Sequence, residues 1–152
     1  MNYLKVILSI SAVAALAVIF KMPLIFPSLG PSALLFFNDD LTLRPKIKTV
    51  FLGHTIGILS GFVAIQLFCL RLEHSQQLDS LNYWHIATAA LAVSLTGFLM
   101  KVSKQFHAPA GASALIVGLG LIFSLTAVSK LILGALVFSV VLRLVSFIEK
   151  VQ

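Results

Sequence analysis

The stretch "GPSALL" at residues 30–35 returns almost unchanged as "GASALI" at residues 111–116. Each copy follows a run that contains proline, "FPSL" at 26–29 and "FHAPA" at 106–110. Proline lacks a backbone N–H and disfavours helix in the residue before it, and glycine permits unusual backbone angles. The two stretches therefore predict breaks, with extended backbone at 27–31 and 107–111. They also predict two helices, the first with Pro31 in its first turn and the second starting near Ala112.

These breaks interrupt a very apolar chain. Of its 152 residues, 59% are hydrophobic and 11% are charged, and the mean hydropathy is +1.06. A soluble domain carries about a quarter charged residues. Uncharged runs such as 49–70 and 80–100 reach the roughly 20 helical residues that cross a bilayer core, and they lack the alternation typical of strands. The sequence predicts an all-α integral membrane protein, which we expect in a bacterial inner (plasma) membrane.

The two copies belong to a longer internal similarity. With a shift of 81 residues, Gly30 and Ser32 fall on Gly111 and Ser113, and with a shift of 80, Lys21 falls on Lys101. We expect one transmembrane domain over residues 1–152, with repeats at about 1–72 and 82–152. Each repeat contains a helix, a broken segment or half-helix, and a second helix. The uncharged run from 112 to 129 predicts a longer second broken segment, nearly a whole crossing.

The number of crossings has two solutions. If all three segments of each repeat cross, the halves are inverted, as in many transporters. Six crossings with a cytoplasmic N-terminus place eight Lys and Arg residues inside and three outside. Four full spans with two re-entrant segments give a split of seven to four. Because cytoplasmic loops of membrane proteins carry an excess of Lys and Arg, these counts favour six crossings but do not exclude four.

A helix N-terminus carries unpaired N–H groups and roughly half a positive charge. Two such ends that enter from opposite sides would form an anion site near the bilayer midplane. The alternative is that each proline-glycine run is a turn at the membrane surface between two ordinary helices. The candidate substrate-binding residues are Ser28, Gly30, Pro31, Ser32, His54, His107, Pro109, Gly111 and Ser113.

Two histidines and a glycine series add to this pattern. His54 lies deep in an apolar run and His107 opens the second break, so either side chain could donate to an anion or carry a proton in symport. The alternative for His54 is a core histidine that bonds to a backbone carbonyl. Gly53, Gly57 and Gly61 recur every four residues, which predicts close helix packing within the chain or across a dimer.

The stretches "FPSLGPSALLFF", "RPKIKTVFLGHTIG" and "HAPAGASALIVG" together resemble the HPP family of integral membrane proteins. That family is named for a His-Pro-Pro motif followed by Ala-Gly-Ala, and here Ala108 stands at the first of the two prolines. The resemblance implies four membrane spans, and nitrite transport as described for some plastid and cyanobacterial members. The matching positions are Gly30, Ser32, Pro45, Gly53, His54, His107, Pro109, Gly111 and Ser113.

From these features we expect a transporter or channel for a small inorganic anion, with nitrite as the leading substrate. The alternative is a non-transporting membrane scaffold or sensory subunit. The acids lie in loops or at the C-terminal end and the histidines lack metal-ligand spacing, so we expect no enzyme, no metal and no cofactor. Expected partners are the lipid bilayer and a second copy in a homodimer. Nucleic acid is not expected, because the positive residues lie at the ends of apolar runs.

Overall fold

The computed structural model describes residues 2–68, 83–122 and 124–147. Within these ranges the chain forms α-helices and no strand, which confirms the predicted all-α class. The expected boundary between the repeats, near 72–82, lies outside the described residues. The helices are α1 (Tyr3–Ile19), α2 (Leu29–Phe36), α3 (Ile47–Leu67), α4 (Tyr83–Ser103), α5 (Ala110–Gly118) and α6 (Leu125–Phe147).

The helices fall into long and short classes. By length and apolar composition α3, α4 and α6 can cross a membrane, whereas α1 is a shorter apolar helix of 17 residues. The helices α2 and α5 have 8 and 9 residues. A rise of about 1.5 Å per residue makes them about 12–14 Å long, which is roughly half of a bilayer core.

The predicted long segment after the second break is wrong. Helix α5 ends at Gly118, and Gly120 follows with a φ of 75°, a left-handed conformation that side chains disfavour. The chain then enters α6 at Leu125. The short helices are therefore matched in length, although the uncharged run that contains α5 is much longer.

The outer faces of the long helices are apolar. Examples are Ile7 on α1, Val63 on α3, Phe98 on α4 and Leu144 on α6, all of which are exposed. A soluble protein rarely exposes so much contiguous apolar surface, whereas lipid is a suitable solvent for it. The exposed faces and the long apolar helices together indicate a membrane-embedded protein.

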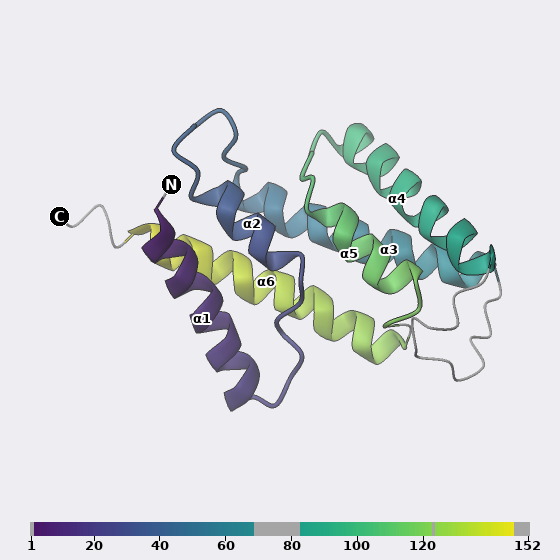
Figure 1. Ribbon diagram of the computed structural model, residues 1–152, viewed down its shortest axis with the longest axis horizontal. Coiled ribbons are helices and arrows are strands. Elements are labelled where there is room, and N and C mark those ends of the chain that lie inside the picture. Colours follow the sequence, from purple (N-terminus) through teal and green to yellow (C-terminus); the bar gives the residue numbers. More distant parts are fainter. Residues whose placement is uncertain (1, 69–82, 123, 148–152) are drawn as a thin grey trace.

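The path of the chain brings each short helix back along the long helix before it. The N–H of Asn2, which caps α1, donates to the carbonyl of Phe37 just after α2, at 3.3 Å. In the second half, the backbone of Gly118 at the end of α5 lies against Thr88 and Ala92 of α4. In Figure 1, α2 and α5 begin near the centre and run outward in opposite directions, and α3 and α6 also run in opposite directions.

The helices α1 and α4 end in the same way. Lys21 and Lys104 have φ angles of 51° and 54°, and the following N–H groups of Met22 and Gln105 donate to carbonyls five residues earlier, each at 3.0 Å. This is a Schellman-type cap, in which glycine is the usual left-handed residue. The backbone therefore pairs Lys21 with Lys104 and not with Lys101.

The helices pack through glycines. A side-chain carbon on Gly57 of α3 would lie 2.3 Å from the carbonyl oxygen of Ala110, and one on Gly61 would lie 2.6 Å from that of Ala114. The predicted glycine stripe thus packs within the chain, against α5. In α6, a carbon on Gly134 would lie 2.5 Å from the carbonyl oxygen of Leu24, in the segment before α2.

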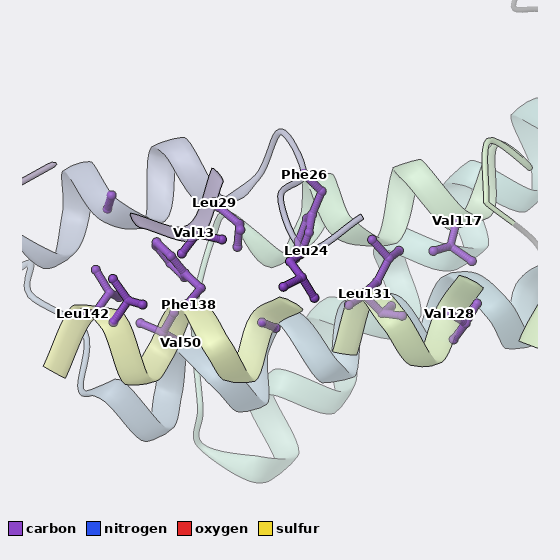
Figure 2. Close-up of a cluster of buried hydrophobic side chains, with 14 of the residues drawn as sticks. Val13, Leu24, Phe26, Leu29, Val50, Val117, Val128, Leu131, Phe138 and Leu142 are labelled. Carbon is purple, nitrogen blue, oxygen red and sulfur yellow. The ribbon is translucent and has the colours of Figure 1, made fainter. Parts of the chain in front are cut away.

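A hydrophobic core surrounds these contacts. Val13 of α1, Val50 of α3 and Phe138 of α6 are fully buried in it. Figure 2 shows Phe138 and Leu142 rising from α6 into this cluster. The core fixes the long helices against one another, and the two short helices meet between them.

Candidate functional site

The starts of the two short helices meet inside the protein. Ser28 is the residue before α2, Ser32 lies in its first turn, and Ser113 lies in the first turn of α5. His54 of α3 and His107 of the segment before α5 reach the same point. All five side chains are at most 2% exposed. These five residues form what we call the Ser–His cluster.

The chain enters both short helices through turns. The N–H of Leu29 donates to the carbonyl of Phe26 at 3.0 Å, and the N–H of Ala110 donates to that of His107 at 3.0 Å. The helices then start at Leu29 and Ala110, so the predicted extended backbone at 27–31 and 107–111 is wrong. Helix α2 has Pro31 in its first turn, as predicted, and α5 starts two residues before the predicted Ala112. Pro31 still fits in the first turn of α2, because a first-turn N–H has no partner within the helix.

Five hydrogen bonds connect the Ser–His cluster. The Oγ of Ser32 contacts Nε2 of His54 at 2.8 Å, Nε2 of His107 at 2.9 Å and the carbonyl oxygen of Ser28 at 2.9 Å. The Nδ1 of His54 contacts Oγ of Ser113 at 2.7 Å. The Oγ atoms of Ser113 and Ser28 are 2.7 Å apart.

With neutral imidazoles, one arrangement of hydrogens satisfies all these contacts. A carbonyl only accepts, so the Ser32 hydroxyl donates to Ser28, and both Nε2–H groups then donate to Ser32 Oγ. A neutral His54 that carries its hydrogen on Nε2 must accept at Nδ1, so the Ser113 hydroxyl donates there. The Ser28 hydroxyl in turn donates to Ser113. The Ser28 hydroxyl thus donates to Ser113 and the Ser113 hydroxyl donates to His54, so both hydrogen bonds point toward His54.

The other predicted site residues lie around the cluster but do not join its hydrogen bonds. Pro31 is exposed, Pro109 is the buried N-cap of α5, and Gly30 and Gly111 are half-buried beside open space. The N–H of Gly111 donates to the carbonyl of Ala108 at 3.1 Å. Side chains, and not backbone N–H groups, are therefore the polar groups that converge in this conformation.

Phe26 is a residue of the site that the sequence did not single out. The ring of Phe26 lies edge-on to that of His54, with centroids 5.6 Å apart, and the rings of His54 and His107 are 5.0 Å apart. Phe26 also lines a cavity of about 330 Å³ with Ile10, Ile25, Pro27, Leu29 and Gly30. Its side chain thus touches the cavity and the Ser–His cluster. The sequence feature that could have pointed to Phe26 is its position, because the 81-residue shift that relates the two repeats places Phe26 on His107.

The cluster contains no charged side chain. Asp40 lies in the exposed loop after α2, where the hydroxyl and the N–H of Thr42 donate to its carboxylate and lower its pKa below the ordinary value. Within the described residues, no third His, Cys, Asp or Glu lies with the two imidazoles in a group that could hold a metal ion. Hydroxyl and imidazole donors without a carboxylate suit an anion better than a cation.

Comparison with known proteins gives one match. A search of curated proteins and a search of solved structures found none. A family model, described as "HPP, transmembrane region", matches residues 1–151, which confirms the resemblance of the three sequence stretches. The chain is therefore an integral membrane protein and belongs to the HPP transmembrane family.

Proposed function

We propose that this protein is a transporter or channel for a small inorganic anion, with nitrite as the leading substrate. The observation that carries the proposal is the meeting of two short helix starts with two imidazoles and three hydroxyls, all buried inside a membrane protein. Ionisable or strongly polar groups at membrane depth are costly, and they usually mark a path for a solute.

The donor geometry suggests how an anion binds. Two imidazole N–H groups, from His54 and His107, point at the single oxygen of Ser32. An oxygen of a small oxyanion that replaces the Ser32 hydroxyl would accept the same two N–H groups. The cluster is closed in this conformation because its members satisfy one another, so binding requires the side chain of Ser32 to turn away.

The arrangement of the helices supports an inverted repeat with six crossings as part of this proposal. The glycines of α3, in the first half, pack on the start of α5, and Gly134 of α6, in the second half, packs on the segment before α2. The broken segment of each half therefore packs against a long helix of the other half. The hydrogen bond between Asn2 and Phe37 places the end of α2 beside the start of α1. The segment 20–37 thus returns along α1, as a broken crossing does.

Labelling of single cysteines tests this topology. Lys21→Cys and Asp40→Cys, each in a chain without Cys69, should react with a membrane-impermeant thiol reagent from opposite sides of the membrane. A re-entrant segment places both positions on the same side. Labelling of both from one side would refute the six-crossing arrangement.

A flux assay tests the function. Purified protein in liposomes should take up nitrite faster than protein-free liposomes, and His54→Ala and Ser113→Ala should each lower the rate at least tenfold. The matched control is Ser60→Ala, because Ser60 is buried on α3 and its hydroxyl has no hydrogen-bond partner in the part of the chain that the structure describes. If the wild type moves no small anion at all, the transporter proposal fails and the scaffold or sensory alternative remains.

A further inference from the structure

We propose that the anion moves together with one proton, which binds at Nδ1 of His54, so that each transport step is electrically neutral. This inference rests on the proposed function and adds a coupling ion to it. It follows from the charges around the Ser–His cluster and from the direction of its hydrogen bonds.

Among residues 2–68, 83–122 and 124–147, the two imidazoles have no charged hydrogen-bond partner. His54 is packed by α2, α5 and the segments before each of them, and His107 is the titratable group among these contacts. Lys21 and Lys104, the lysines of these two segments, are exposed. Helices α2 and α5 carry no ionisable side chain. Neither imidazole makes a hydrogen bond or a ring contact with any other ionisable group of α1, α3, α4 or α6. These groups are Tyr3, Lys5, Lys48, Tyr83, His85, Lys101, Lys130 and Arg143.

This isolation links the proton to the anion. A buried charge without a partner is costly, so neither an imidazolium nor an anion is stable alone in the cluster. Together they form a neutral pair. Each therefore raises the affinity of the site for the other by the same factor, because linkage between two ligands is reciprocal.

The hydrogen bonds provide a route for the proton. A hydronium ion that protonates Oγ of Ser28 becomes water and leaves a new O–H bond there, while the original Ser28 hydrogen passes to Ser113 and the Ser113 hydrogen passes to Nδ1 of His54. Each oxygen gains one hydrogen and loses one, and His54 becomes an imidazolium. The distances for both internal transfers are 2.7 Å, and both donors already point toward His54.

The same transfer creates a binding position for the anion. Ser113 now donates back to Ser28, so the new Ser28 hydroxyl hydrogen has no acceptor in the cluster. An anion in the place of the Ser32 hydroxyl, next to Ser28 and between the Nε2–H groups of His54 and His107, supplies that acceptor and neutralises the imidazolium.

Flux measurements with wild-type protein in liposomes decide the question. The probes are nitrite and nitrate, with a pH-sensitive dye inside, and protein-free liposomes correct for diffusion of neutral nitrous acid. We expect an acidic exterior to drive uptake, with one proton entering per anion. A potassium diffusion potential of either sign, set with valinomycin, should leave the rate unchanged.

Three results separate the possible failures. Uptake that follows the membrane potential without internal acidification would overturn the coupling and leave the anion transporter intact. No uptake of either anion would overturn both proposals. His54→Gln protein that elutes from a size-exclusion column as a folded species should lose proton-coupled uptake, whereas Ser60→Ala should keep it. If the remaining flux of His54→Gln still carries one proton per anion, His54 is not the residue that binds the coupled proton.

Discussion

Gly57→Ala is the substitution that should separate the short helix α5 from α3 most directly. The added carbon would lie 2.3 Å from the carbonyl oxygen of Ala110, whereas ordinary contacts begin at 3.4 Å. The obstacle is backbone and not a flexible side chain. Helix α5 must therefore move away from α3 by about 1 Å, since a close-packed contact has no spare volume.

The expected cost is a balance of two terms. Overpacking of this kind costs about 1–3 kcal/mol, and a contact with backbone belongs near the upper end. Alanine gains about 1 kcal/mol over glycine within a helix. The free energy of unfolding should therefore fall by about 2 kcal/mol. A 1 Å shift of α5 would also lengthen the 2.7 Å contact between His54 and Ser113 to about 3.7 Å, which is no longer a hydrogen bond.

The assay is reversible unfolding in mixed micelles of sodium dodecyl sulfate and dodecyl maltoside, followed by circular dichroism, with anion flux measured in parallel. Flux should fall by about two orders of magnitude, because a site displaced by 1 Å loses its geometry. Gly97→Ala is the matched control, because Gly97 lies in α4 with nothing within 4 Å of the added carbon. If Gly57→Ala is as stable and as active as Gly97→Ala, the reasoning about close packing is wrong.

Ser113→Ala should lower the free energy of unfolding by about 1–3 kcal/mol in the same micelle titration, because it removes a buried hydroxyl that contacts two other side chains. Ser139→Ala should change it by less than about 0.5 kcal/mol, since that hydroxyl only bonds to a carbonyl of its own helix, and equal losses would contradict the importance of the cluster. Ser60→Ala should be neutral or stabilising, because the lost hydroxyl is buried without a partner, and a clear loss of thermal stability would show that Ser60 has one. Lys21→Gly should raise the melting temperature and stabilise by about 1 kcal/mol, since glycine adopts the left-handed cap at less cost, and a lower melting temperature would exclude this gain.

The helices were predictable because their determinants are local. Apolar runs set the four longer helices, and the proline-glycine runs set the two breaks. The start of α5 was misplaced by two residues and the backbone before both short helices was wrongly predicted as extended, since turns at Pro27 and at Ala108 add hydrogen bonds that proline rules alone do not include. The left-handed cap at Lys104 was missed because lysine gives no signal for that conformation.

The candidate site was predictable in part. Ser32, Ser113 and His54 stand out because polar side chains are unusual within apolar runs. Their mutual contacts depend on packing between segments far apart in the chain, such as the 85 residues that separate Ser28 from Ser113. The sequence also gave no reason to choose side-chain hydroxyls over backbone N–H groups, because that choice depends on local turns such as the one at Gly111.

The Ser–His cluster also imposes an order on membrane insertion. Ser28 and His54 enter the bilayer long before their partner Ser113 exists, since 59 residues separate His54 from Ser113. At about 5–20 residues per second, a ribosome takes about 3–12 s to make that stretch. During this interval the Ser28 hydroxyl lacks the acceptor, and Nδ1 of His54 lacks the hydroxyl donor, that Ser113 provides in the folded protein. The second half of the chain therefore acts as the folding template that withdraws these polar groups from lipid.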